Sequence, residues 1–192
     1  MDHPSFSLVV EALAFAAERH RDQRRKDPAR TPYINHPIAL VRVLYLEARI
    51  QDPLVLCAAL LHDTVEDTGT TCEEIEARFG LAVREVVMEV TDDKRLPKTE
   101  RKRLQVLHAA RASEPARLVK LADKICNLRD VAANAPVGWD LERQRAYFDW
   151  AREVVEGMRG THEGLEALFD QAYARRPTET SDQKESSANE RR

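Results

Sequence analysis

The segment 53–61 restricts the fold of this chain more than any other. It reads PLVLCAALL, so a helix formed here carries apolar side chains almost all round, and Pro53 suits the first helical turn. A helix of that kind is stable only where other elements cover it on every side. The segment therefore predicts a helix at the centre of a packed domain.

Elsewhere, apolar residues recur at steps of three and four, which is the period of amphipathic helices. Glycine is scarce, with 6 among 192 residues, and this also favours helices. A chain of this length suits one domain with one core. We therefore expect a single all-α domain, a bundle of about eight or more helices. The expected helices cover residues 5–21, 37–48, 53–61, 71–80, 81–90, 97–112, 115–131, 140–158 and 162–173, and residues 64–71 are expected to form a polar loop.

The overall charge argues against large anionic partners. The formal net charge is −3, which provides no attraction to nucleic acid or to an anionic membrane. Apolar stretches are shorter than the about 20 residues that span a bilayer, and the first residues do not resemble a signal peptide. The three cysteines are odd in number and widely spaced, so we expect them to be reduced. These features predict a cytoplasmic protein that binds neither nucleic acid nor membrane, and they leave its oligomeric state open.

The last residues differ in composition from the rest. The segment 176–192 contains no aromatic or branched aliphatic residue, so it cannot bury enough surface to offset the entropy of ordering. We expect the domain to cover residues 1–175 and residues 176–192 to form a disordered tail.

The end of the apolar segment carries an unusual group of ionisable residues. His62 and Asp63 follow it directly, and Glu66 and Asp67 come within the next turn. Burying carboxylates without a partner costs several kcal/mol per charge. A divalent cation would neutralise them and would accept an imidazole nitrogen as a ligand. This arrangement predicts a metal site.

Two other apolar segments carry single polar residues of metal-binding type. His36 lies just before Pro37 at the start of an expected helix, and Asp123 lies in the sequence VKLADKICNL. Asn127, four residues after Asp123, shares its helical face. With His62 and Asp63 these residues would form a set of two histidines and two aspartates on three helices, with open positions for water and substrate. Each residue taken alone has an ordinary structural explanation, so the prediction depends on the joint pattern.

The motifs together resemble the hydrolase domain of the RelA/SpoT family within the HD superfamily, and most closely its stand-alone small alarmone hydrolases of the metazoan SpoT-homologue type. The similarity spans about residues 4–173, and its motifs are long and collinear. The matching segments are RRK at 24–26, PYINHP at 32–37, HD at 62–63, ED at 66–67, TDDK at 91–94, KLADK at 120–124, NL at 127–128, GW at 138–139 and YFDW at 147–150.

The resemblance implies an HD-type fold and a role for each matching residue. Glu66 and Asp67 match the pair that positions and deprotonates the attacking water. The implied metal is manganese, one ion per chain, although zinc and iron also suit such ligands. The family's metal ligands fall on His36, His62, Asp63 and Asp123.

Substrate contacts are implied for a further group. Arg25 and Lys26 match a basic pair in the nucleotide pocket, where a guanidinium can stack on a purine. Between this pair and Pro32 the chain has a longer loop than the larger bifunctional enzymes, which leaves the exact contacts open. The full set of expected substrate-binding residues is Arg25, Lys26, Tyr33, Lys98, Asn127, Arg143 and Tyr147.

The activity implied by the resemblance is hydrolysis of the 3′-pyrophosphate of guanosine 3′,5′-bis(diphosphate), ppGpp, or of pppGpp, to GDP or GTP and pyrophosphate. Relatives of this small type are also associated with removal of the 2′-phosphate of NADPH, and the sequence does not separate the two substrates. A non-catalytic nucleotide-binding sensor is a third hypothesis. The complete set of candidate ligands and the two water-handling carboxylates argue against it, because a silent site has usually lost at least one.

Overall fold

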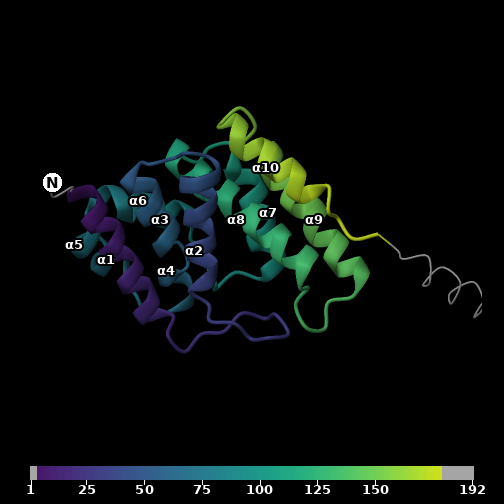
Figure 1. Ribbon diagram of the computed structural model, residues 1–192, viewed down its shortest axis with the longest axis horizontal. Coiled ribbons are helices and arrows are strands. Elements are labelled where there is room, and N and C mark those ends of the chain that lie inside the picture. Colours follow the sequence, from purple (N-terminus) through teal and green to yellow (C-terminus); the bar gives the residue numbers. More distant parts are fainter. Residues whose placement is uncertain (1–3, 179–192) are drawn as a thin grey trace, which may run out of the picture.

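The computed structural model describes residues 4–178, and these residues form helices joined by connections, of which residues 20–34 make a long one (Figure 1). Within this range the only extended pairing is an isolated bridge between Arg24 and Pro32. The predicted all-α fold is confirmed. The elements are α1 (Pro4–Arg19), α2 (Asn35–Arg42), the π-helix η1 (Val43–Glu47), α3 (Pro53–Leu61), α4 (Thr64–Asp67), α5 (Cys72–Phe79), α6 (Leu81–Val90), α7 (Lys98–Ala109), α8 (Glu114–Ala133), α9 (Leu141–Glu156) and α10 (Glu163–Tyr173).

Helix α3 lies at the centre of one half of the molecule, as its composition predicts. Residues 55–61 are all buried, and α3 contacts α1, α2, α6 and α8. Figure 1 shows it among these helices. The Asp52 side chain accepts a hydrogen bond from the Leu54 backbone N–H at 2.9 Å and so caps the helix. His62 and Asp63 follow the last buried turn and are held in place by it.

Helix α8 connects that half to the C-terminal helices. It contacts α2, α3, α6, α9 and α10, and it is capped by the preceding Ser113, whose side chain accepts from the Ala116 N–H. Eleven of its residues are buried, among them Lys120 and Lys124. This burial places Asp123, in the middle of the helix, beside the start of α2 and the end of α3.

The predicted loop 64–71 was wrong in its first half. Residues 64–67 form one helical turn, α4, in which the Asp67 N–H donates to the Asp63 carbonyl oxygen at 2.8 Å. The Thr64 hydroxyl also donates to the Leu61 carbonyl oxygen. The polar composition suggested a loop, but these local bonds satisfy the backbone and turn Glu66 and Asp67 back toward the end of α3.

The helix expected over 37–48 also differs in detail. It begins at Asn35, and Pro37 occupies its third position, where a missing N–H breaks no helical bond. Its last part, Val43–Glu47, is a π-helix in which the Ala48 N–H donates to the Val43 carbonyl oxygen. The apolar period did not distinguish this wider turn from an α-helix.

Part of the expected tail is attached to the domain. Arg176 forms a two-pronged ion pair with Asp149 of α9, at 2.9 and 2.7 Å, and Arg145 donates to the Pro177 carbonyl oxygen. Residues 179–192, the rest of the expected tail, lie outside the described range. Among the helices of the described range, none combines the length and the apolar character needed to cross a membrane.

Candidate metal centre and adjoining cavity

His62 is oriented by the helix that precedes it. Its Nδ1 lies 2.9 Å from the carbonyl oxygen of Ala59, which can only accept, so Nδ1 carries a hydrogen. The other ring nitrogen, Nε2, is buried and has no hydrogen-bond partner in the described part of the chain. The ring therefore offers Nε2 to a ligand, which is the usual arrangement of a metal-binding histidine.

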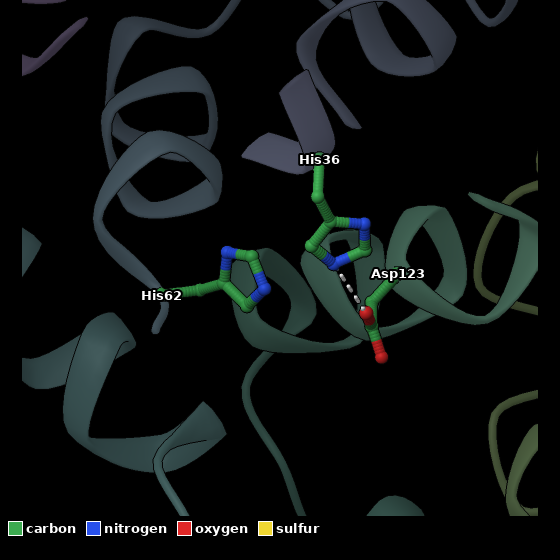
Figure 2. Close-up of side chains that lie close together, drawn as sticks. All are labelled: His36, His62 and Asp123. Carbon is green, nitrogen blue, oxygen red and sulfur yellow. Dashed lines mark hydrogen bonds and ion pairs between the residues drawn. The ribbon is translucent and has the colours of Figure 1, made fainter. Parts of the chain in front are cut away.

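Three candidate ligands from three helices meet at this point. His36 at the start of α2, His62 after α3 and Asp123 on α8 each offer one ligand atom, and these atoms lie within 4.8 Å of one another. Figure 2 shows the two rings and the carboxylate facing a common centre. His36 Nε2 lies 3.2 Å from Asp123 Oδ1. The two histidines are buried and Asp123 is partly buried, with 17% of its side chain exposed, so a cation here would lose much of its contact with water.

Asp63 adjoins this group but stands slightly apart from it. Its Oδ2 lies 2.9 Å from His62 Nε2, although the pair lacks the alignment of a hydrogen bond. The same oxygen accepts a hydrogen bond from the Tyr33 hydroxyl. All four expected metal ligands thus lie at one place, and three of them form the tightest cluster.

The electrostatics of the four residues fit a divalent cation. Burial disfavours a charged His62, but the facing Asp63 carboxylate raises its pKa to about 9. Burial also opposes charge on Asp123, yet Lys124 and His36 hold its pKa well below the ordinary value. The site therefore contains two ionised carboxylates and an imidazole, His62, that binds a proton tightly. A divalent cation could take the place of that proton and balance the charge of the carboxylates.

Asn127 and Lys124 support Asp123 from the same helix. Asn127 Nδ2 donates to Asp123 Oδ1 at 2.5 Å, as their shared helical face predicts. The buried ammonium of Lys124 lies 3.0 Å from Oδ2. Both oxygens of the carboxylate therefore have an orienting neighbour.

Glu66 is a carboxylate with an unusual environment. Its oxygens accept from the Asp92 backbone N–H at 3.1 Å and face the Arg101 guanidinium at 3.4 Å. Burial, together with the charges of Asp63 and Asp92, outweighs the Asp92 hydrogen bond and raises the pKa of Glu66 to about 7. A carboxylate with such a pKa can exchange a proton near neutral pH, which suits a general base.

Asp67 lies on the same turn and at the wall of a cavity. Its Oδ2 accepts from Gln23 Nε2 at 2.8 Å, and its Oδ1 is paired with Lys94. The cavity has a volume of about 500 Å³, which is enough for a nucleotide-sized ligand. Its lining includes Arg25, Lys26, Tyr33, His36, Asp67, Asn127, Trp139 and Tyr147.

Five of the seven expected substrate-binding residues thus line the cavity. The other two, Lys98 and Arg143, are not among the described residues that line it. Arg143 lies over the ring of Trp139 at 4.7 Å, and the pKa of Lys98 is lowered by burial and then by the charges of Arg143 and Lys26. These two residues therefore form a basic rim near the cavity rather than its wall.

The sequence reasoning missed several residues of this site. Gln23 and Lys94 hold the Asp67 carboxylate, and Asp130 pairs with the Arg25 guanidinium. Lys94 lies in the TDDK segment at 91–94, one of the segments that carry the family resemblance, but no role was expected for it. Gln23 stands beside a run of charged residues and has no local pattern of its own, so only its contacts identify it.

Comparison with known proteins agrees with this geometry. A family model described as HD domain matches residues 12–147. The guanosine-3′,5′-bis(diphosphate) 3′-pyrophosphohydrolase MESH1 of Xenopus tropicalis is 59% identical over 167 residues, covering 87% of this chain and 93% of that protein. The Homo sapiens protein of the same name is 56% identical over 168 residues, covering 88% and 94%.

A solved structure is also similar throughout the domain. It is described as a metazoan ortholog of SpoT that hydrolyzes ppGpp and plays a role in starvation responses. Its TM-score is 0.85 at 52% identity, with 88% of this chain and 95% of that chain covered. The chain therefore belongs to the HD-domain family and, within it, to the MESH1 group of small stand-alone proteins.

Proposed function

We propose that this protein is a metal-dependent hydrolase that removes the 3′-pyrophosphate of ppGpp or pppGpp. The observation that carries the proposal is the meeting of His36, His62 and Asp123 around one point, next to a cavity with a basic wall. The MESH1 relatives, named for this activity, cover nearly the whole chain. The products are GDP or GTP and pyrophosphate.

His36, His62, Asp63 and Asp123 would hold the cation, which we propose to be Mn²⁺. Mixed imidazole and carboxylate ligands also suit zinc and iron, so the choice of manganese is the finer part of the proposal. When bound, such a cation supplies Lewis-acid chemistry that lowers the pKa of water and offsets phosphate charge.

Glu66 and Asp67 would act on the attacking water. Because the pKa of Glu66 is raised to about 7, its carboxylate can take a proton from water and return it within one cycle near neutral pH. Asp67 is held by hydrogen bonds at both oxygens, so it is suited to orienting that water.

The cavity wall would bind the nucleotide. The Arg25 guanidinium lies 5.7 Å from the centre of the Tyr33 ring and pairs with Asp130, and all three residues line the cavity. A guanidinium in that position can stack on a purine. Lys26 lies in the wall, and Lys98 and Arg143 at the rim can meet the remaining phosphates as they enter.

The test is product identification with purified protein. We expect pyrophosphate release from ppGpp that depends on added Mn²⁺ and is lost with a chelator. NADPH, whose 2′-phosphate would leave as orthophosphate, is the comparison substrate. A protein that releases no pyrophosphate from ppGpp with any of the three metals would refute the proposal, and faster orthophosphate release from NADPH would reassign the substrate.

A further inference from the structure

The carboxylate of Asp67 is held by a residue far away in the sequence. Gln23, in the turn after α1, donates from Nε2 to Asp67 Oδ2 at 2.8 Å, across 44 positions of the chain. A carboxylate at neutral pH only accepts hydrogen bonds, so the amide nitrogen of Gln23, and not its oxygen, must face Asp67. This contact connects the end of α1 to α4.

The other end of the Gln23 amide is also fixed. His20 Nδ1 lies 2.6 Å from Gln23 Oε1, and because the amide oxygen only accepts, Nδ1 carries the hydrogen. The His20 side chain is 1% exposed, and its ring packs against Tyr33 with 4.8 Å between ring centres. Gln23 therefore cannot rotate away without breaking a partly buried hydrogen bond.

The same segment is also linked to a second carboxylate, that of Asp63. The Gln23 carbonyl oxygen accepts from the Tyr33 N–H at 3.0 Å, and the Tyr33 hydroxyl donates to Asp63. The segment after α1 is thus linked through Tyr33 to a candidate metal ligand, and through the Gln23 side chain to a candidate water-handling residue. From this segment, Asp67 is contacted by the Gln23 side chain. Asp63 is contacted by Tyr33, which is bonded to the Gln23 backbone and not to its side chain.

The second partner of Asp67 cannot replace Gln23. Lys94 pairs with Oδ1, but its side chain is 49% exposed, and a long exposed side chain holds a partner weakly. Asp67 itself has only 19% of its side chain exposed. Without the Gln23 amide, the carboxylate would be free to follow Lys94 toward solvent. A water-handling group displaced by about 1 Å can cost on the order of 100-fold in rate.

We propose that Gln23, fixed by His20, is a positioning residue that aims the Asp67 carboxylate at the attacking water. The inference rests on the proposed function, because it assigns a task within that reaction. Gln23 also lines the cavity, so a direct contact with substrate is the competing explanation. The two explanations predict different kinetic effects of replacing Gln23: a positioning role lowers kcat, whereas a direct substrate contact raises KM.

The test is the isosteric Gln23→Glu variant, which keeps the volume and the acceptor for His20 but removes the donor that faces Asp67. We expect kcat to fall by at least about tenfold, with KM within about threefold and Mn²⁺ uptake unchanged. Gln23→Met, which removes the donor without adding charge, should lose kcat in the same direction. Gln171→Glu makes the same change on the exposed face of α10 and should leave both constants unchanged.

A double-mutant cycle tests the part assigned to His20. His20→Phe preserves the ring against Tyr33 and removes the hydrogen bond to Gln23. Because both residues act through one carboxylate, the double variant should be no slower than Gln23→Glu alone. A kcat of Gln23→Glu within twofold of wild type, a loss confined to KM, or additive losses in the cycle would each overturn the inference. A wild-type enzyme that leaves ppGpp intact would instead refute the proposed function.

Discussion

His62 donates a hydrogen bond from Nδ1 to the carbonyl oxygen of Ala59, 2.9 Å away and one turn earlier in the chain. The bond leaves Nε2 as the nitrogen that faces His36 and Asp123 (Figure 2). Helix α3 therefore supplies both a candidate ligand and the group that orients it. Because the last turn of α3 is fully buried, the orientation is set by packing rather than by the metal.

The first prediction concerns metal binding. His62→Gln should lower the affinity for Mn²⁺ by more than about tenfold, because loss of a residue that only orients a ligand already costs about that much. Calorimetric titration of the metal-free protein would measure it. His108→Gln, on the exposed side of α7, is the matched control and should bind as the wild type does. Equal uptake by both variants would contradict the assignment of His62.

The second prediction concerns Asp67. Asp67→Ala should lower kcat by about 10²–10⁴-fold, the usual contribution of a group that handles a proton or its water. Metal content and the unfolding temperature should stay close to wild type, since Asp67 lies outside the cluster of ligand atoms. Asp22→Ala removes an aspartate that is 90% exposed and serves as the control. Unchanged turnover in Asp67→Ala would remove Asp67 from the mechanism.

The third prediction concerns the dependence of stability on pH. Burial raises the pKa of Glu66 from 4.5 to about 7 in the folded protein. The folded state therefore binds the proton more tightly than the unfolded state, and this contribution to stability is lost as pH rises from about 4.5 through 7. Above pH 7, ionised Glu66 should cost the metal-free protein about 1–3 kcal/mol, less than the full shift implies because the side chain is partly solvated.

Glu66→Gln removes that cost and retains an acceptor for the Asp92 N–H. In urea unfolding of the metal-free protein, the variant should be more stable than wild type at pH 8 and about equally stable at pH 5. Glu85→Gln, on the exposed face of α6, should show no such difference between the two pH values. A variant that is stabilised more at pH 5 than at pH 8 would show that the sign is wrong.

The fourth prediction concerns the core. Leu60→Ala on α3 removes a side chain that is 2% exposed, and it should lower the free energy of unfolding by about 2–5 kcal/mol. Leu46→Ala removes the same group where it is 52% exposed, and its effect should stay within about 0.5 kcal/mol. Chemical denaturation measures both. Similar losses in the two variants would contradict the central position of α3.

Several features of the fold could be predicted because they follow from local patterns. The apolar run 53–61 predicted a buried central helix, and the period of three and four predicted the helices around it. The pairing of Asp123 with Asn127 followed from their spacing on one helix. Turn α4 was missed because its stability comes from bonds to Leu61 and Asp63 rather than from an apolar face.

The amino-acid sequence by itself determined where the helices lie and which residues of metal-binding type they carry, because helical period and residue chemistry are local properties. Only the tertiary structure decided which of these residues meet. His36, His62 and Asp123 converge because the apolar faces of α2, α3 and α8 are buried against one another, and the packing of separate helices is not encoded in any short segment. For the same reason Gln23 was identified by its contacts, while Lys98 and Arg143 lie at the rim and not in the wall.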